Sequence, residues 1–471
     1  MGRVMNANFY ALVESRFPVD RDAPCLILPD GGALSYGVIA AMAGRIARLL
    51  ADRGITPGDR IVVQTDKTPE ALALYLAALK IGAIYTPLNS AYTEAEMAYF
   101  IGDAEPTLVV RDAAALAGEA AGLAPLDTIA PREAGDIASL IYTSGTTGRS
   151  KGAMLTHGNL AANGEALIEA WGYSRADVLL HALPIFHVHG LFISLHCALL
   201  TGAPLIWLPK FDEAEVLRLL PRATVMMGVP TFYTRLLGES GFDRTGTAHM
   251  RLFVSGSAPL LESTFAEFEA RTGMRILERY GMSEAIVITT NPLAGDRVPG
   301  SVGHPLPGVG LRIAGGEGTG GIEIRGPSVF SGYWRMPEKT AEEFTEDGWF
   351  RTGDVGRTDP DGRLWISGRA KDLIISGGYN VYPKEIELLL DTLDGIAESA
   401  VIGVPHRDFG EAVVAIVTGT GDEADLIAQA RTRLAAFKAP KRILFADDLP
   451  RNAMGKVQKN VLRERYAGLF G

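Results

Sequence analysis

Short apolar runs alternate with helical patterns through residues 60–272 of this chain, and this alternation is the feature that most limits its fold. Residues 60–65 (RIVVQT) are predicted to form a strand, and residues 69–81 a helix that begins at a proline. Further predicted strands cover residues 107–110, 139–142, 204–208, 225–229 and 252–255, with helices at residues 159–171, 212–220, 231–238 and 260–272. Strands separated by helices are typical of βαβ units, so we predict an α/β fold with parallel-rich sheets and flanking helices.

The pattern changes twice toward the C-terminus. Glycine and short strands dominate residues 302–370, which predicts a small antiparallel region. An α+β pattern follows, with helix, strand, strand, helix and strand at residues 383–390, 399–404, 412–418, 423–436 and 442–445. A chain of 471 residues is long enough for more than one domain. We therefore predict a large N-terminal domain, residues 1–369, and a small C-terminal domain, residues 370–471.

Charge and composition exclude several classes of protein. The net charge of −10 disfavours bulk binding to nucleic acid or to an anionic membrane, so an anionic ligand needs a local positive pocket. We find neither an apolar stretch of about 18 residues nor the apolar core and cleavage site of a signal peptide. Cys25 and Cys197 lack metal-ligand spacing and cannot form a disulfide framework for a chain of this size. We expect a cytoplasmic protein.

Residues 142–153, YTSGTTGRSKGA, follow a predicted strand and combine glycine with hydroxyl groups. Glycines such as Gly145 and Gly148 let backbone N–H groups turn inward, and Lys151 supplies a point charge. The hydroxyl donors are Thr143, Ser144, Thr146 and Thr147. The segment therefore predicts an anion-binding loop. It is not a Walker loop, because Gly-Lys-Ser/Thr is absent, nor a dinucleotide fingerprint, because no G-x-G-x-x-G follows the first strand.

This loop resembles the signature loop of the adenylate-forming superfamily, which includes acyl-CoA synthetases, aryl-CoA ligases, luciferases and adenylation domains. Six further segments resemble motifs of that superfamily in the same order: FHVHG (186–190), SGSAPL (255–260), RYGMSE (279–284), GWFRTGDVG (348–356), GRAKDLIISGGYNVYPKEIE (368–387) and PRNAMGK (450–456). The resemblance implies a ligase that activates a carboxylic acid as an acyl-adenylate and passes the acyl group to a thiol. It also implies ATP, Mg²⁺ and CoA as ligands.

The same resemblance implies which residues bind ATP. Tyr280 would stack on adenine, Ser283 would bond the α-phosphate, and Asp354 would accept the ribose hydroxyls. Glu284 would hold Mg²⁺, a normal role for one carboxylate beside phosphate and water, and Thr143 would assist it. The other residues implied at the ATP site, beside the loop itself, are Ser257, Ala258, Gly281, Met282 and Arg369.

The resemblance also implies a catalytic lysine and a mobile lid. Lys456 would arrive on the C-terminal domain and bridge carboxylate and phosphate, with Lys371 at the hinge. His187 would gate the acyl pocket. Ser376, Gly377 and Gly378 would line the tunnel for the thiol arm of CoA.

Arg279 narrows the choice of acid. A guanidinium beside the acyl pocket blocks a fatty-acyl tunnel and suits a second carboxylate through bidentate bonding. Arg297 lies in a nearby segment, and we predict that it and His187 also contact the substrate carboxylate. The segments ERYGMSE, DRVPGSVG, FSGYWRMPEKT and GGYNVYPKEIE together resemble malonyl-CoA synthetases. The implied substrate is malonate, not distinguished from methylmalonate because one methyl group is worth about 1 kcal/mol.

Three other functions stay open at this point. A short-chain monocarboxylate CoA ligase would not depend on Arg279 for selectivity. A stand-alone adenylation enzyme would load a separate carrier protein. A nucleotide-binding regulator without catalysis would not need Lys456, Glu284 and Asp354, and their presence argues against it.

Overall fold

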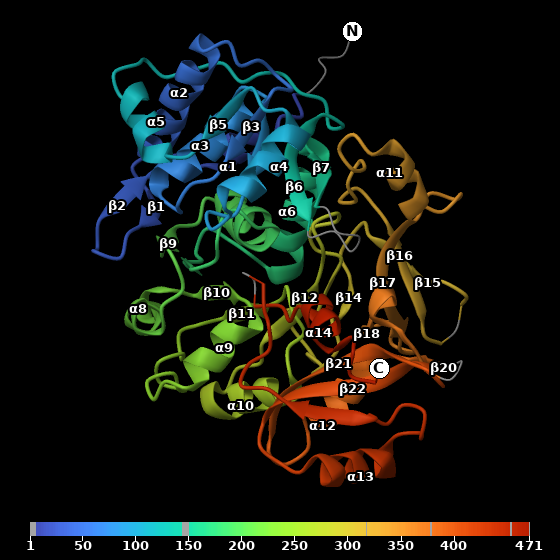
Figure 1. Cartoon of the computed structure of the whole chain (residues 1–471). Coiled ribbons are helices and arrows are strands. Elements are labelled where there is room, and N and C mark those ends of the chain that lie inside the picture. Colours follow the sequence, from blue (N-terminus) through green and yellow to red (C-terminus); the bar gives the residue numbers. More distant parts are fainter. Residues whose placement is uncertain (1–5, 144–149, 317, 377–378, 453–454, 471) are drawn as a thin grey trace. The chain divides into compact units, whose positions relative to one another are not determined.

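The computed structural model of the chain describes residues 6–143, 150–316, 318–376, 379–452 and 455–470. It divides into two compact units (Figure 1). The first unit comprises residues 1–256, 262–310 and 324–350, and the second comprises residues 257–261, 311–323 and 351–471. Helices and parallel-rich sheets alternate in the first unit, so the predicted α/β class is confirmed.

A nine-stranded sheet forms one layer of the first unit, in the order β14-β13-β12-β11-β10-β8-β9-β1-β2. Its central strands β12, β11, β10, β8, β9 and β1 are parallel to one another, while β2, β13 and β14 are antiparallel to their neighbours. The strands are β1 (Pro24–Ile27), β2 (Ala33–Ser35), β8 (Leu179–His181), β9 (Leu205–Trp207), β10 (Val225–Gly228), β11 (Leu252–Ser255), β12 (Leu277–Tyr280), β13 (Thr289–Thr290) and β14 (His304–Pro305). The carboxyl ends of parallel strands share one edge, where ligand-binding side chains gather in such folds.

A second sheet of the first unit has the order β5-β3-β4-β6-β7. The strands are β3 (Arg60–Val63), β4 (Ile84–Pro87), β5 (Leu108–Val110), β6 (Ile137–Thr143) and β7 (Lys151–Thr156). Strands β5, β3, β4 and β6 are parallel, and β7 is antiparallel to β6. The predicted anion-binding loop therefore connects two antiparallel strands.

Helices cover both sheets of the first unit (Figure 1). Local chemistry sets the start of several helices: the Thr68 side chain caps α3 ahead of Pro69, and Thr156 forms a capping box with Asn159 at α6. The helices are α1 (Phe9–Arg16), α2 (Tyr36–Asp52), α3 (Pro69–Lys80), α4 (Glu94–Ala104), α5 (Ala113–Ala120), α6 (His157–Trp171), α7 (Leu195–Thr201), α8 (Glu213–Leu219), α9 (Pro230–Leu237), α10 (Glu262–Thr272) and α11 (Pro337–Glu343). Of the helices in the described ranges, none has the length and apolar composition needed to cross a membrane.

Residues 302–370 contain a separate antiparallel sheet, as predicted. Its order is β15-β16-β17-β18, with β17 and β18 pairing antiparallel and Asp354 opposite Arg369. The strands are β15 (Gly310–Ile313), β16 (Gly320–Arg325), β17 (Phe350–Thr358) and β18 (Leu364–Arg369).

The last part of the second unit is a sheet of order β20-β19-β22-β21, with β23 beside β22. Helices α12 and α13 pack on one face and α14 on the other (Figure 1), because alternate residues of β21 and β22 enter two apolar clusters. The elements are β19 (Ile374–Ser376), β20 (Tyr379–Val381), α12 (Pro383–Leu390), β21 (Ile396–His406), β22 (Gly410–Gly419), α13 (Glu423–Arg433), β23 (Arg442–Phe445) and α14 (Lys459–Tyr466). The order of helices and strands matches the prediction.

Candidate functional site

Arg279 lies on β12 and is only 4% exposed. Two of its guanidinium nitrogens, Nε and Nη2, have no hydrogen-bond partner among the described residues. Burial lowers the pKa of Arg279 to about 9, so it remains a cation at neutral pH. The room for it comes from Gly256, where a Cβ atom would lie 2.5 Å from the guanidinium carbon of Arg279. The first unit thus holds a buried cation with free donors.

Two histidines lie near this cation, at the start of a six-residue π-helix, η1 (His189–Ser194). The pKa values of His187 and His189 are both lowered, first by burial and then by the charge of Arg279, and that of His187 falls to about 4. Both imidazoles are therefore neutral at neutral pH. The backbone N–H of His189 donates to Nδ1 of His187 at 3.2 Å, which leaves Nε2 as the protonated nitrogen of a neutral His187 ring. The structure thus places His187 close enough to Arg279 for its charge to act on the imidazole.

Glu284 and Lys151 are joined through Tyr333, a residue to which the sequence gave no role. The Tyr333 hydroxyl donates to Glu284 Oε1 at 2.9 Å. The Lys151 ammonium lies 4.0 Å from the centre of the Tyr333 ring and 3.5 Å from Glu343. Tyr333 therefore fixes one oxygen of the carboxylate and provides a π face for the lysine. The only sequence signal for it was the segment FSGYWRMPEKT, which carries a tyrosine but says nothing of its contacts.

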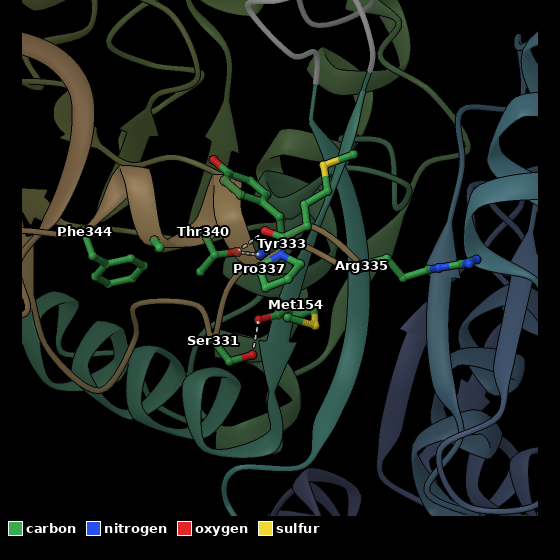
Figure 2. Close-up of a pocket in the computed structure, with 9 residues that line it drawn as sticks. Met154, Ser331, Tyr333, Arg335, Pro337, Thr340 and Phe344 are labelled. Atoms are coloured by element: carbon green, nitrogen blue, oxygen red, sulfur yellow. Dashed lines mark hydrogen bonds between the residues drawn. The ribbon is translucent and has the colours of Figure 1, made fainter.

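A surface pocket of 390 Å³ lies beside Tyr333 (Figure 2). The Tyr333 N–H donates to the Thr340 hydroxyl at 2.9 Å, and that hydroxyl donates to the Met336 carbonyl at 2.8 Å. Figure 2 shows Arg335 pointing away from Thr340, and its guanidinium pairs with Glu105 at 2.6 Å. These contacts hold the backbone from which Tyr333 reaches Glu284.

The backbone of the RYGMSE segment is tightly constrained. A Cβ atom on Gly281 would lie 1.9 Å from the Ile286 carbonyl oxygen, so only glycine fits. Ile286 itself has φ of 61°, a strained conformation for a β-branched residue, and Ser257 of the SGSAPL segment has φ of 73°. The predicted nucleotide contacts Tyr280, Met282, Ser283, Ser257 and Ala258 are all partly exposed.

The anion-binding loop is described only at its two ends. Thr143 ends β6 and Lys151 begins β7, and their Cα atoms are register partners. The predicted contacts Ser144, Gly145, Thr146, Thr147 and Gly148 lie outside the described residues.

A second group of charges lies within the second unit. Asp354 is 4% exposed, and Arg369 Nε is 3.1 Å from its Oδ1 atom. Burial, followed by the charge of Arg369, lowers the pKa of Lys371. Burial is also the main reason that the pKa of Lys456 falls to about 8; Arg369 and Lys371 lower it further, while Asp354 and Asp372 oppose the shift. The charge of Lys456 is therefore sensitive to pH near neutrality.

Several contacts anchor the backbone that carries Lys456. The Lys456 N–H donates to the Asn452 side chain at 3.0 Å, and Arg451 donates to the Gly455 carbonyl at 2.7 Å and pairs with Glu398. On α14, Arg463 pairs with Asp372 at 2.7 Å. Ser376 is buried at the end of β19, and Gly377 and Gly378 lie outside the described residues.

Backbone carbonyls hold Arg297. Its guanidinium donates to three of them, those of Arg275, Pro292 and Leu293. Two of the three lie within five residues of it, so the side chain stabilises its own loop. Its contact with the substrate carboxylate stays a prediction.

Comparison with known proteins identifies the family. Residues 13–334 match the AMP-binding enzyme family, and residues 385–456 match the AMP-binding enzyme C-terminal domain. The chain belongs to the AMP-binding enzyme family. Malonate–CoA ligase of Arabidopsis thaliana is 35% identical over 98% of this chain and 89% of its own length. A long-chain-fatty-acid–CoA ligase of Bacillus subtilis is 33% identical over 92% of this chain and 90% of its own length.

Among solved structures, ATP-bound MatB from Rhodopseudomonas palustris is 49% identical to this AMP-binding enzyme. The alignment covers 99% of this chain and 100% of that one, with a TM-score of 0.96. The two sequence relatives above act on very different acids at nearly equal identity, so family membership alone does not decide the acid. The side chains of the pocket must decide it.

Replacing Gly281 with alanine tests the constraint on the RYGMSE backbone of this AMP-binding enzyme. The added Cβ would overlap the Ile286 carbonyl, so we expect a loss of about 1–3 kcal/mol in stability and weaker ATP binding. Thermal unfolding and ATP calorimetry measure these effects. Gly102→Ala in α4 is the control, because a Cβ there meets nothing within 4 Å. Equal behaviour of the two variants would contradict the constraint.

The charges around Lys456 predict its titration. We expect its amine to lose a proton as the pH rises through about 8 in the ligand-free enzyme. Arg369→Gln removes a repelling cation and should raise this pKa, whereas Asp354→Asn removes an attracting anion and should lower it. NMR titration of ¹³C-methylated lysine, assigned with Lys456→Arg, measures the value. An unchanged pKa of Lys456 in both variants would show that the charges of Arg369 and Asp354 do not act on its amine.

Proposed function

We propose that this AMP-binding enzyme is an acid–thiol ligase that converts malonate, ATP and CoA to malonyl-CoA, AMP and pyrophosphate. In the first step a malonate oxygen attacks the α-phosphorus of ATP and pyrophosphate leaves. In the second step the CoA sulfur attacks the acyl carbon of the adenylate and AMP leaves. The observation that carries the choice of malonate is Arg279, a buried cation with two unpartnered nitrogens.

The chemistry of a diacid explains why such a cation is present. One carboxylate of malonate is consumed by adenylation, and the other keeps its charge inside the pocket. A guanidinium binds a carboxylate through two parallel hydrogen bonds, which neutralises both charges. A monocarboxylic acid would leave Arg279 buried without an anion, which is costly. The neutral His187 beside it adds a hydrogen-bond donor without a second positive charge.

On the ATP side, the proposal assigns roles to the residues of each unit taken by itself. In the first unit, Lys151 and the loop hydroxyls hold phosphate, Tyr280 stacks on adenine and Ser283 bonds the α-phosphate. Gly281 and Met282 carry these side chains. In the second unit, Asp354 accepts the ribose hydroxyls, Arg369 adds a donor, and Ser257 and Ala258 border the adenine.

Mg²⁺ fits Glu284, assisted by Thr143. The described residues contain no group of three or more His, Cys, Asp or Glu side chains suited to a metal, so the protein would supply few ligands and the phosphates the rest. The Tyr333 hydroxyl donates to Glu284 Oε1 at 2.9 Å, which would keep the carboxylate in a fixed position for the ion. Bound Mg²⁺ would supply charge neutralisation for the phosphates.

Lys456 is the proposed catalytic residue of adenylation, and its positive charge would bridge the carboxylate and the α-phosphate. We place the functional boundary at residues 369 and 370, with Lys371 as the hinge that lets the C-terminal domain withdraw Lys456. The loop of Ser376, Gly377 and Gly378 would then border the path of the CoA thiol. Cys25 and Cys197 are buried free thiols, which suits the reducing cytoplasm that we propose for this enzyme.

Lys456→Ala separates the two half-reactions. We expect adenylation to be lost, because the bridging charge is removed, while thioester formation from supplied malonyl-adenylate persists. ATP–pyrophosphate exchange with malonate measures the first step, and release of malonyl-CoA measures the second. Lys459→Ala, three residues along the same segment, is the control. Exchange near the wild-type rate in Lys456→Ala would contradict the assignment.

Arg279→Met tests the choice of acid. The variant keeps side-chain volume but removes the cation, so we expect malonate to lose about 1.5–3 kcal/mol of binding, a rise in KM of roughly tenfold or more. Turnover of acetate and propionate should change little, and stability should hold or rise because an unpaired buried charge is gone. A panel of mono- and dicarboxylates with CoA as acceptor measures selectivity. Equal losses on all acids would point to a monocarboxylate ligase, and transfer only to a carrier protein would replace CoA in the proposal.

A further inference from the structure

Lys67 is a lysine buried in the core of the first unit, in the loop between β3 and α3. Its ammonium has three partners: Nδ1 of His181 at 2.7 Å, the His181 carbonyl at 2.8 Å and the Leu208 carbonyl at 2.6 Å. The Trp207 ring lies beneath it, 4.4 Å from Nζ to the centroid. Among the described residues no carboxylate pairs with it. Burial lowers the pKa of Lys67 well below the usual range, so keeping its ammonium charged in this position costs free energy.

The hydrogen bonds of His181 fix where the protons are. Nε2 of His181 lies 2.9 Å from the Gly190 carbonyl, which can only accept, so Nε2 carries a proton. In a neutral ring Nδ1 is then an acceptor, and Lys67 must donate to it. Lys67 also donates to two carbonyls, so all three ammonium protons are used. Lys67 and His181 together therefore carry one positive charge. It lies on the amine of Lys67, because an amine is more basic than an imidazole.

The Gly190 carbonyl ends the FHVHG segment at the point where the chain departs from α-helical geometry. It accepts from the Leu195 N–H, five residues on, as well as from His181. A side chain that inserts into a helical ladder in this way favours a π-turn. The turn is tight, since a Cβ on Gly190 would lie 2.0 Å from the Pro184 carbonyl oxygen.

This turn sets the direction of the two histidines that lie near Arg279. The Leu191 N–H donates to the His187 carbonyl at 2.9 Å, so the position of His187 follows from that of the turn. Burial lowers the pKa of His189 most, and the charges of Arg279, His187 and His181 lower it further. The printed hydrogen bonds thus form a path from Lys67 through His181 and Gly190 to the segment that carries His187.

We propose that Lys67 is a positioning residue for the acid-binding pocket. Its ammonium selects the His181 tautomer that donates to Gly190, and this contact holds His187 and His189 against Arg279. The inference rests on the proposed function only in taking the region of Arg279 as the acid site. A simple packing role does not explain it, because an apolar side chain would fill the same space without a buried charge.

The experiment compares Lys67→Met with Lys80→Met in the full-length enzyme. Lys80 is the control: it is also buried in the first unit, with its ammonium 4.7 Å from the centre of the Tyr10 ring and 3.9 Å from Glu14, and these contacts, among the described residues, lie outside the FHVHG segment. For Lys67→Met we expect KM for malonate to rise by about tenfold to a hundredfold while KM for ATP is unchanged, because a small misplacement at a binding site has effects of this size. For Lys80→Met both KM values should stay near wild type.

Loss of stability alone would change both variants alike, so thermal unfolding is recorded beside the kinetics. Parallel rises in both KM values, or the same KM for malonate in both variants, would overturn the inference. If Lys67→Met does not fold, His181→Phe decides, because its ring fills similar space but can neither accept from Lys67 nor donate to the Gly190 carbonyl. We expect a selective rise in KM for malonate there, and an unchanged value would reject the inference.

Failure of the proposed function is a separate result. If the wild-type enzyme does not turn over malonate, the same comparison is made with the acid that the wild-type enzyme does use. A selective rise in KM for that acid supports the role of Lys67, and no rise refutes it.

Discussion

The buried guanidinium of Arg279, whose Nε and Nη2 have no hydrogen-bond partner among the described residues, is the group on which the proposed acid site depends. Desolvating Arg279 costs free energy, and no hydrogen bond from Nε or Nη2 to a described residue offsets this cost. Gly256 leaves space for the guanidinium, because any larger residue there would overlap it. The Tyr233 hydroxyl donates to the Val254 carbonyl at 2.6 Å. The neutral histidines avoid adding a second charge. An anion that binds beside Arg279 would offset the free-energy cost of burying its charge. The same buried charge would therefore both favour a diacid substrate and destabilise the ligand-free protein.

The enzyme carries a net charge of −10, yet its candidate sites are cationic. In the second unit Arg369 and Lys371 act on Lys456 as cations, and Asp354 and Asp372 act on it as anions. Burial lowers the pKa of Lys456 most and the two cations lower it further, a shift that a bound phosphate would reverse. Positive charge is thus concentrated at the candidate site, while the net negative charge of the chain disfavours non-specific binding to other anions.

The sequence predicted the fold well where local pattern decides structure. The apolar run at residues 60–65 and the proline at the start of the next helix predicted β3 and α3, because strand burial and helix starts depend on a few neighbouring residues. The roles of Arg279, Glu284 and Lys456 come from the family motifs and stay predictions. The three backbone carbonyls that accept from Arg297 could not be predicted, because no sequence pattern reveals such contacts.

Residues that act through long-range contacts could not be predicted from the sequence. Tyr333 and Glu284 are 49 residues apart, and Lys67 and His181 are 114 residues apart. The sequence pattern alone indicates only that Tyr333 is an aromatic residue in a loop and that Lys67 is a solvated lysine before a helix. Only the fold makes Lys67 a buried cation, and only then does its chemistry have a consequence.

Strained backbone near the candidate site also depends on contacts with neighbouring groups. Ile286 and Ser257 hold positive φ angles, and η1 departs from α-helical geometry, each within or beside a segment that carries candidate site residues. Such conformations cost of order 1–3 kcal/mol and persist only where neighbours enforce them. Gly281 allows the close approach of the Ile286 carbonyl, and His181 provides a donor for the carbonyl at η1. Because contacts within the protein hold the strained backbone, it keeps its geometry before any ligand binds, and binding energy need not be spent on forming it.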